Sequence, residues 1–288
     1  MPEGPLSVQD TAYWVAFYRA LESERPDALF SDPYARPLAG TRGEAILARM
    51  PRGRQYGWPM VVRTAVMDEV VTRIAPRVDA VLNLAAGLDS RPYRLELPAS
   101  LRWIEVDFPS MLEYKAGVLE PATAKCVIER VPLDLADVPA RKELFARLGA
   151  QVRSALVITE GLLIYLSADE AGALADDLSS RRSFTYWLTD VASPFVLRIV
   201  QRTWGKELRA SGTLFKFGPE DAPAFFAAHG WCLKEYHANI IEGQRLHREF
   251  PMAWLWRALL PFMWRQEASR RSGPMAGVLL LENAKSAS

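Results

Sequence analysis

The fold is decided by residues 78–107, which begin Val-Asp-Ala-Val-Leu-Asn-Leu-Ala-Ala-Gly-Leu-Asp-Ser-Arg and end Trp-Ile-Glu-Val-Asp. The apolar run at 78–84 has the length of a buried parallel strand, and three small residues at 85–87 follow it. A second apolar strand at 101–106 ends in Asp107, twenty residues after the glycine of the turn. A small-residue turn after one strand and a carboxylate at the tip of the next predict a doubly wound sheet that binds a nucleoside through its ribose hydroxyls.

Apolar strands alternate with helical patterns along the rest of the chain. Helices are expected at 109–119, 140–149 and 168–180, between strands. Such alternation is typical of a parallel sheet with right-handed crossovers, so we expect an α/β fold. The seven expected strands are 78–84, 101–106, 126–131, 155–160, 184–190, 231–237 and 277–282.

One domain is expected over residues 1–288, because this length suits a single α/β core with extra helices. Helical patterns at 10–22 and 61–74 precede the first strand, and Asp10 is a candidate N-cap of the first. The expected parts are a helical cap at 1–76, a cofactor-binding core at 77–192, substrate-side helices and a lid with one strand at 193–270, and the last strand and tail at 271–288.

Composition argues against several classes of protein. The 35 basic and 34 acidic side chains nearly cancel, so no nucleic-acid partner is expected. Cys126 and Cys232 are far apart and lack a Cys-x-x-Cys spacing, which argues against disulfides or zinc and fits a reducing cytoplasm. The Trp-rich segment 250–264 is too short for a membrane span, which takes roughly twenty apolar residues. We expect it to close over an apolar pocket as a helix, with a membrane-surface helix as the alternative.

The turn at 85–87 does not suit a dinucleotide, and alone it also fits an ordinary strand-to-helix connection. A dinucleotide fingerprint places three glycines here, as Gly-x-Gly-x-x-Gly, and this turn has one. A pyrophosphate needs free amides at a helix N-terminus, whereas Asp89 places a carboxylate where that phosphate would lie. A nucleoside with a cationic or zwitterionic tail therefore suits the site better.

Three further polar positions each have two interpretations. Asp134, with Leu135 beside it, either caps the next helix or meets the exocyclic amine of adenine. Glu160 emerges from an apolar strand, so it either pairs with an arginine or lies beside a positive charge of the cofactor. Arg63 is either a solvated helical arginine or a clamp for a ligand carboxylate. The sequence leaves all three open.

Six motifs occur along residues 10–190 in a familiar order. They are Ser31-Asp32-Pro33-Tyr34-Ala35, Arg63-Thr64, Asn83-Leu84-Ala85-Ala86-Gly87-Leu88-Asp89-Ser90-Arg91, Glu105-Val106-Asp107-Phe108-Pro109, Asp134-Leu135 and Glu160-Gly161-Leu162-Leu163-Ile164-Tyr165. Together they resemble the leucine carboxyl methyltransferase family, and within it the bacterial branch that includes polyketide carboxyl O-methyltransferases of the tetracenomycin type. Beyond residue 190 the resemblance is much weaker.

This resemblance implies a class I methyltransferase, with a Rossmann-like seven-stranded mixed sheet, helices on both faces and the last strand antiparallel. It implies S-adenosyl-L-methionine as cofactor and S-adenosyl-L-homocysteine as product. Arg63 would hold the cofactor's carboxylate and Glu160 would lie near its amino group. Gly87 would line the methionine moiety, Asp107 would take the ribose, and the pair at 134–135 would contact adenine. The implied cofactor-binding residues are Arg63, Ala85, Ala86, Gly87, Asp107, Phe108, Asp134, Leu135, Glu160 and Gly161.

Ala85 departs from the family, which usually has glycine at this position. Alanine fits here if its φ is negative. If φ is positive, cofactor affinity is expected to fall, and a degenerate scaffold becomes conceivable.

The histidines bear on the methyl acceptor. A carboxylate is ionised at pH 7 and needs no general base, whereas a phenol, with a pKa near 10, benefits from one. His229, His237 and His247 are each better explained as structural or surface residues, which favours a carboxylate; only His247 lies near the expected lid. The hydroxyl of Tyr165 is expected to orient the acceptor. Tyr165 and His247 are therefore the candidate catalytic residues, and no metal is expected.

Aromatic residues of the expected lid favour a flat hydrophobic substrate, namely Phe195, Trp204, Phe215, Phe217, Trp254 and Trp256. The expected activity is O-methylation of a carboxylate on a hydrophobic small molecule, such as a polyketide or other secondary metabolite, by a cytoplasmic monomer or homodimer. The alternatives are methylation of a phenol or alcohol, methylation of a protein's C-terminal carboxylate, and non-catalytic binding. A nicotinamide-dependent oxidoreductase is disfavoured by the missing glycines.

Overall fold

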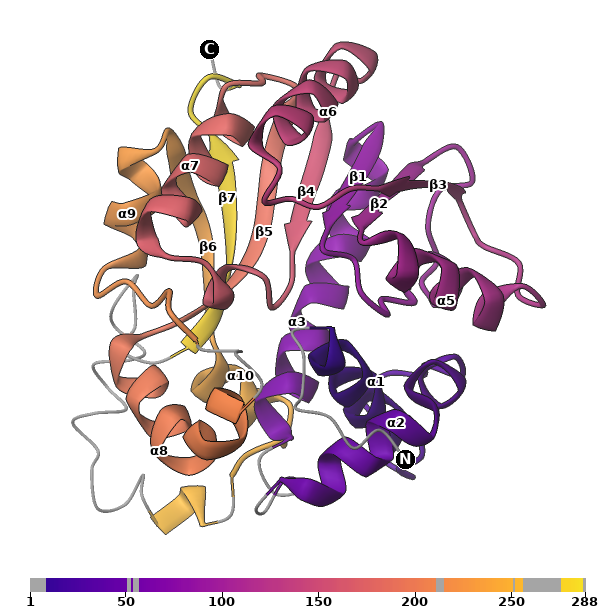
Figure 1. The fold of residues 1–288 in the computed structure, drawn as a ribbon, viewed down its shortest axis with the longest axis vertical. Helices are drawn as coiled ribbons and strands as arrows, with labels where there is room; N and C mark the ends of the chain where they lie inside the picture. Colours follow the sequence, from indigo (N-terminus) through magenta and orange to yellow (C-terminus); the bar gives the residue numbers. More distant parts are fainter. Residues whose placement is uncertain are drawn as a thin grey trace.

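Seven strands form one mixed sheet in the order β3-β2-β1-β4-β5-β7-β6 (Figure 1). The computed structural model describes residues 9–50, 53, 57–210, 215–250, 252–255 and 276–286. β7 is antiparallel to both of its neighbours, and the remaining pairs are parallel. The predicted seven-stranded sheet with an antiparallel last strand is therefore confirmed. The strands are β1 Ala80–Leu84, β2 Arg102–Asp107, β3 Val127–Pro132, β4 Ala155–Thr159, β5 Phe184–Ala192, β6 Trp231–Ala238 and β7 Ala276–Asn283.

The most apolar strands lie in the middle of the sheet. All five residues of β1 and all five of β4 are buried, because helices cover both faces there. β3 is an edge strand whose residues are at least partly exposed, and Pro132 at its end matches the confinement of proline to strand edges.

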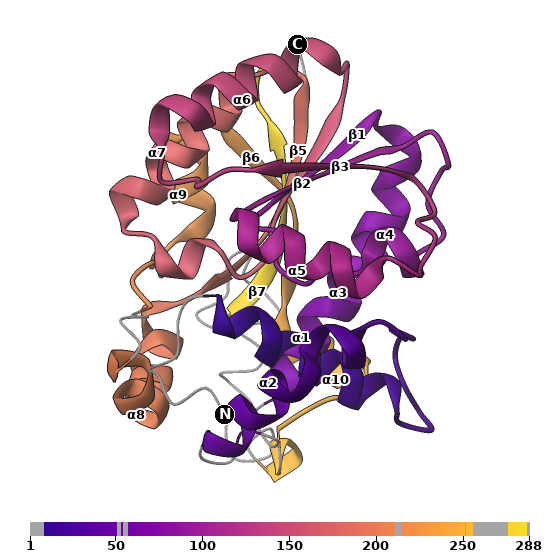
Figure 2. The same cartoon turned by 45° about the vertical axis from the view of Figure 1, so that its right-hand side comes forward.

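Helices cover the two faces of the sheet unequally (Figure 2). α6 (Val138–Gln151), α7 (Ala168–Ser179) and α9 (Ala222–Ala228) pack with the strands into one apolar cluster. α3 (Trp58–Ile74) covers the other face through an apolar stripe that includes Val62, Val66 and Val70. Shorter elements complete the fold, namely η2 (Ala75–Arg77), α4 (Arg91–Arg94), α5 (Pro109–Leu119), η3 (Leu163–Tyr165) and α10 (Asn239–Arg245).

A separate apolar cluster caps the end of the sheet at which the parallel strands finish. It joins α1 (Asp10–Ser23) and α2 (Ala35–Arg49) to α5 and to Phe215. The valines of α3, which belongs to the expected cap at 1–76, pack against the strands, whereas α1 and α2 belong to the separate cluster. α2 was not predicted; Pro37 and Gly40, whose φ is 53°, interrupt its helical pattern.

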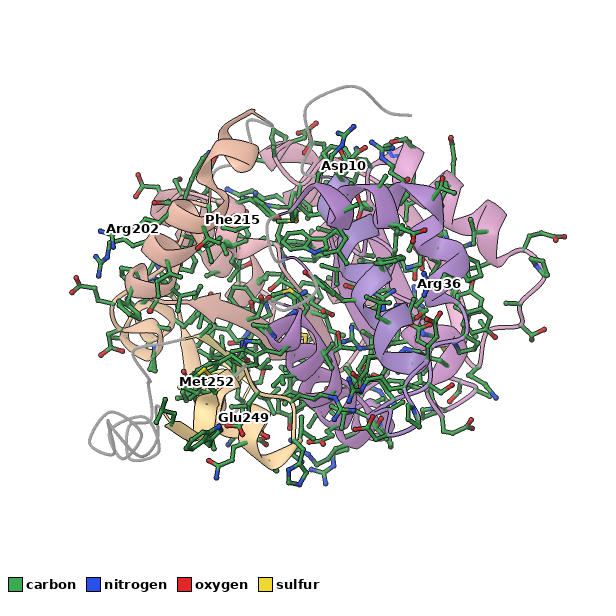
Figure 3. All side chains as sticks on the ribbon, turned by 90° about the horizontal axis from the view of Figure 1, so that it is seen from below. Asp10, Arg36, Arg202, Phe215, Glu249 and Met252 are labelled. Atoms are coloured by element: carbon green, nitrogen blue, oxygen red, sulfur yellow. The ribbon has the colours of Figure 1, made fainter. Side chains whose placement is uncertain are left out.

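β1 lies between β2 and β4, so the strand order reverses at this point. The carboxyl ends of these strands point toward α1 and α2 (Figure 1). Viewed from below, α1 and α2 lie on one side of this end, and α8 (Pro194–Ala210) lies on the other, next to Phe215 (Figure 3). Ligands of doubly wound sheets bind at such a reversal, outside the carboxyl ends of the strands.

Candidate active site

The turn after β1 contains two residues in the left-handed region. Ala85 has a φ of 51° and Gly87 a φ of 47°. The condition that Ala85 keeps a negative φ is therefore not met. An L-residue in this conformation brings its Cβ close to the following carbonyl, at a cost of roughly 1–2 kcal/mol. Residue 85 thus has a backbone conformation that favours glycine, and because it is alanine the backbone is strained there.

Asp107, the last residue of β2, holds this turn. Its Oδ2 accepts a hydrogen bond of 2.7 Å from the N–H of Gly87, and its Oδ1 accepts one of 2.7 Å from the N–H of Phe108. Burial raises the pKa of Asp107 above its usual range. A Cβ added to Gly87 would lie 3.3 Å from the Cβ of Ala12, so α1 passes directly over the turn. The glycine permits this approach.

The loop after β4 carries the predicted Glu160 and Gly161. Glu160 Oε1 accepts a hydrogen bond of 3.1 Å from Nε of Arg63, which reaches over from α3. Nη1 of Arg63 donates to Oδ2 of Asp190 at 2.9 Å, and the N–H of Gly161 donates to Oδ1 of the same carboxylate at 2.6 Å. The structure thus brings Arg63 to Glu160 and Gly161, which lie far from it in the sequence. Asp190, which was not predicted, bonds to both Arg63 and Gly161.

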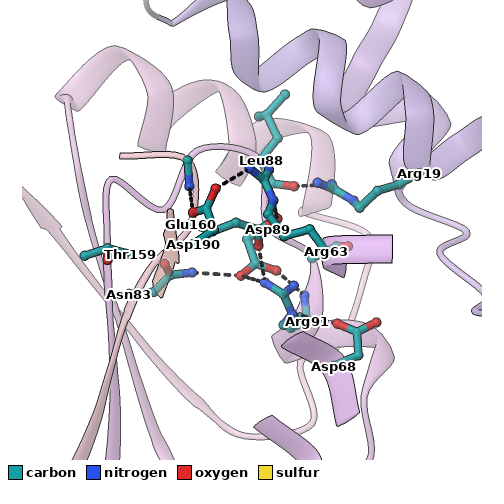
Figure 4. Close-up of polar contacts among 12 residues, drawn as sticks. Arg19, Arg63, Asp68, Asn83, Leu88, Asp89, Arg91, Thr159, Glu160 and Asp190 are labelled. Atoms are coloured by element: carbon teal, nitrogen blue, oxygen red, sulfur yellow. Dashed lines mark hydrogen bonds and ion pairs between the residues drawn. The ribbon is translucent and has the colours of Figure 1, made fainter. Parts of the chain in front are cut away.

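Arg91 links the two loops and is fully buried (Figure 4). Its Nη1 donates to Oδ2 of Asp89 at 2.9 Å and to Oε2 of Glu160 at 2.7 Å, while its Nε donates to Asp68 at 2.7 Å. Burial alone would raise the pKa of Glu160, but Arg91 and Arg63 hold it below its usual range. Burial opposes ionisation of Asp89 too, yet Arg91 keeps its pKa well below the usual range.

Asp89 therefore faces inward. Its Oδ2 also accepts a hydrogen bond of 2.8 Å from Asn83 of β1. The sequence placed this carboxylate where a phosphate would bind. In the structure it has a structural role instead, because it accepts hydrogen bonds from Arg91 and Asn83 within the protein.

The residues predicted to meet adenine lie at the rim of this site. Phe108 follows Asp107 and is one of the exposed large apolar side chains, at 38%. Oδ1 of Asp134 accepts a hydrogen bond of 2.9 Å from the N–H of Ala136, so it stabilises its own turn, and Asp137 caps α6 instead. Leu135 is half-buried against the core. The contacts with adenine remain predictions.

Tyr165 lies in η3, at the end of the loop that begins with Glu160. Its ring packs edge-on against Phe215, with ring centroids 5.4 Å apart, and burial raises the pKa of its hydroxyl to about 12. A hydrogen bond with Thr11 of α1 acts in the opposite direction. Tyr165 is therefore protonated throughout the physiological range and can donate a hydrogen bond, but cannot serve as a base there.

The histidines lie apart from this loop. His229 precedes β6, at the far end of the sheet, and its Nδ1 is 2.8 Å from Oδ1 of Asp176. His237 lies between two carboxylates, with Nδ1 3.1 Å from Glu242 Oε1 and Nε2 3.2 Å from Glu235 Oε2. The hydrogen bond to Glu242 contributes most to raising the pKa of His237.

His247 has an exposed side chain in a turn with a φ of 53°. Within the described part of the chain, no hydrogen bond or ion pair joins it to the residues around Glu160. Solvent exposure does not suit a base that acts on a sequestered acceptor, so its catalytic role is not supported by this position.

The lid aromatics are only partly covered by the structure. Phe215 and Phe217 are buried, whereas Phe195 and Trp254 are largely exposed. The predicted helix at 250–264 lies mostly outside the described residues, as do Trp256 and the side chain of Trp204. Among the residues that are described, no group of three His, Cys, Asp or Glu side chains is arranged to hold a metal ion, and no helix has the length and apolarity to cross a membrane.

Asp190 and Arg91 were missed by the sequence analysis. Asp190 ends the strand expected at 184–190, just as Asp107 follows the strand expected at 101–106. The same signal, a carboxylate at a strand tip, was present at both positions. Arg91 was quoted only as part of a motif, because nothing local shows that Glu160, 69 positions away, is its partner.

The strand order, the left-handed turn after β1 and the carboxylates at the carboxyl ends of β2 and β5 together define a class I methyltransferase. The chain belongs to the leucine carboxyl methyltransferase family, whose model matches residues 12–179. This confirms the predicted family.

Relatives agree with this assignment over most of the chain. A provisionally named S-adenosyl-L-methionine-dependent methyltransferase of Streptomyces coelicolor is 34% identical over 253 residues, 79% of this chain and 84% of the relative. A relative of the same provisional name from Frankia alni is 36% identical over 251 residues, 80% of this chain and 85% of the relative.

Solved structures show the same fold at low sequence identity. A provisionally named methyltransferase from Thermobifida fusca superimposes with a TM-score of 0.57 at 13% identity, covering 98% of this chain and 96% of that one. A DUF574 family protein from Streptomyces avermitilis gives a TM-score of 0.56 at 15% identity, over 93% and 96% of the two chains.

Proposed function

We propose that this chain is an S-adenosyl-L-methionine-dependent O-methyltransferase that acts on a carboxylate of a hydrophobic small molecule. The observation that carries the choice of acceptor is the position of the histidines. His229 and His237 are paired with carboxylates, and His247 is exposed to solvent. A carboxylate acceptor needs no base, because it is ionised at neutral pH.

The cofactor is S-adenosyl-L-methionine, and the residues present fit it. Asp107 is a buried carboxylate with two backbone donors, which leaves acceptor capacity on both oxygens for ribose hydroxyls. Arg63 is a buried cation that can hold the carboxylate of the methionine end, and Glu160 can accept from its ammonium group. Gly87 lines the same end, and Phe108 and Leu135 would flank the adenine.

When bound, this cofactor supplies a methyl group that is already electrophilic, on a sulfonium sulfur. The protein therefore has to align the acceptor and exclude water. Tyr165 is suited to align a carboxylate, because its hydroxyl stays protonated and lies between the loop after β4 and α1. The aromatic ring of Phe215 beside it offers an apolar surface for the rest of the substrate.

The experiment that tests this function uses cofactor labelled in the methyl group and a panel of aromatic acids and phenols. A carboxyl methyl ester releases its label as methanol in mild alkali, whereas a phenol ether keeps it. We expect alkali-labile label on acids alone. Stable label on phenols, with a basic limb near neutral pH in the kcat profile, would support the phenol alternative.

Tyr165→Phe is the matched site variant for this assay. It removes one hydroxyl and keeps the ring packing on Phe215. We expect slower transfer and an unchanged affinity for S-adenosylhomocysteine. Full activity of the variant on every acceptor would show that Tyr165 does not orient the acceptor. A second variant, His247→Ala, should leave methyl transfer unaffected.

A further inference from the structure

Asp190 occupies a position in one half of the sheet that corresponds to that of Asp107 in the other. β2 and β5 are the outer neighbours of the central strands β1 and β4. Asp107 at the tip of β2 accepts from the N–H of Gly87 at 2.7 Å, and Asp190 near the tip of β5 accepts from the N–H of Gly161 at 2.6 Å. Both glycines are left-handed, with φ of 47° and 66°. Each central loop is thus held by the carboxylate of the next strand outward.

The second oxygen of Asp190 is used differently from that of Asp107. It accepts from Nη1 of Arg63 at 2.9 Å, while Nε of the same guanidinium donates to Glu160 at 3.1 Å. The guanidinium lies against Gly161, where a Cβ would be 3.4 Å from Nη1 and 3.7 Å from Nη2. Two of the three nitrogens of Arg63 are therefore fixed by carboxylates.

Nη2 is the third nitrogen of this guanidinium, beside Nε and Nη1, which bond to the two carboxylates. Within the described residues, no hydrogen bond from Nη2 to a protein acceptor is present. The side chain is only 8% exposed, and Nη2 lies beside Gly161 of the loop after β4. Arginine has several rotatable bonds, and holding it at two points removes most of the freedom that ligand binding would otherwise have to restrict.

We propose that Asp190 is a positioning residue for the amino-acid end of the cofactor. It fixes the Arg63 guanidinium and the Gly161 N–H, so that Nη2 of Arg63 is already aimed at the cofactor's carboxylate. This inference rests on the proposed role of Arg63. It predicts that Asp190 matters for ligands that carry the amino-acid end and not for ligands that lack it.

Asp190→Asn tests the proposal. An amide has one acceptor oxygen and one donor nitrogen, whereas both oxygens of Asp190 accept, so either orientation of asparagine places a donor against a donor. Calorimetry would compare S-adenosylhomocysteine with 5′-methylthioadenosine, which has the same adenosine and sulfur but no amino-acid end. We expect the Kd of S-adenosylhomocysteine to rise by about tenfold or more and that of 5′-methylthioadenosine to stay unchanged.

A double-variant cycle separates positioning from direct contact. In an Arg63→Ala background, Asp190→Asn should have no further effect on S-adenosylhomocysteine, because the residue it positions is gone. If Arg63→Ala itself weakens both ligands equally, the proposed role of Arg63 fails. If Arg63→Ala is selective and Asp190→Asn is not, the positioning role alone fails.

Two controls keep the result interpretable. Asp79→Asn changes a carboxylate that likewise accepts from an arginine, Arg153, and from backbone N–H groups, but that lies at the amino end of β1, and it should leave both affinities unchanged. Asp190→Glu keeps two acceptor oxygens on a longer arm and should retain part of the selectivity even if Asp190→Asn folds poorly. Equal weakening of both ligands by Asp190→Glu would overturn the proposal, because it would show a general loss of structure.

Discussion

The loops after β1 and β4 share one backbone feature and differ in their electrostatics. In both, a left-handed glycine donates its N–H to a carboxylate at or near the end of the neighbouring strand. Within the described contacts, Asp107 accepts only from backbone N–H groups, and burial raises its pKa. Glu160, by contrast, lies between two guanidinium groups that lower its pKa.

This difference matches the two ends of the cofactor. Ribose hydroxyls are neutral donors, and they suit a carboxylate that has no cation bound to it. The methionine end is a zwitterion. It suits a loop in which a guanidinium can donate to its carboxylate and a carboxylate can accept from its ammonium group. Under the proposed assignment, similar geometry in the two loops would bind two kinds of ligand group because the charges of the loops differ.

The largest effect is a loss of stability, and it is expected at Arg91, which links the loop after β1 to the loop after β4. Arg91→Ala would remove the guanidinium that contacts both Asp89 and Glu160. Two buried carboxylates, Asp68 and Asp89, and the partly buried Glu160 would lose this partner. Breaking a buried ion pair from one side costs about 3–5 kcal/mol. Urea unfolding should show a loss of stability of this order. Arg153→Ala, which removes an exposed partner of Asp79, should leave the midpoint nearly unchanged.

A smaller effect, on ligand affinity, should distinguish the loop after β1 from the loop after β4. Asp107→Ala should weaken cofactor binding by about 1.5–3 kcal/mol, the magnitude of hydrogen bonds to a charged group. Because the ribose is common to both ligands, S-adenosylhomocysteine and 5′-methylthioadenosine should lose affinity equally in calorimetric titrations. Asp190→Asn should affect only the first of them. A selective loss in Asp107→Ala would break the comparison, and an unchanged Kd would remove Asp107 from the ribose.

Local spacing explains why one half of the site could be predicted. Gly87 lies in the turn after β1, and Asp107, twenty positions later, ends the next strand, so the turn and its carboxylate form one recognisable unit. Arg63 and Asp190 are 127 positions apart and come from a helix and a strand on either side of the core. No local pattern connects them, although the sheet brings them within hydrogen-bonding distance.

The fold was more predictable than the site, for a physical reason. Buried parallel strands such as β1 and β4 are apolar runs, and the structure has a strand at each of the seven expected positions. The helical period of α3 was equally visible, but which layer its valines pack against depends on tertiary contacts. The φ of Ala85 was not predictable either, because alanine has no local preference for the left-handed region.

The strain at Ala85 offers a test with opposite signs in the two loops. Ala85→Gly should raise the free energy of unfolding by about 0.5–1 kcal/mol, since relief of a positive φ is partly offset by the entropy that glycine gains on unfolding. Gly161→Ala should lower it by about 1–2 kcal/mol, since its φ is 66°. Chemical denaturation measures both changes. A loss of stability in Ala85→Gly would show that the alanine side chain contributes packing that outweighs its backbone strain.

The smallest effect is a pH dependence of ligand affinity, which is expected for the loop after β1, where Asp107 lies, and not for the loop after β4. Burial raises the pKa of Asp107 above its usual range, whereas Arg91 and Arg63 hold the pKa of Glu160 below its own, so protonation of Asp107 is shifted to higher pH and that of Glu160 to lower pH. If the ribose binds the ionised form, that proton must leave on binding, and affinity falls as the pH drops through the raised pKa. Titration of 5′-methylthioadenosine, which has no titrating tail, should show this acid limb, and Asp107→Asn should bind more weakly at neutral pH but without the limb. An identical acid limb in Asp107→Asn would assign the titration to another group and leave the two loops electrostatically alike.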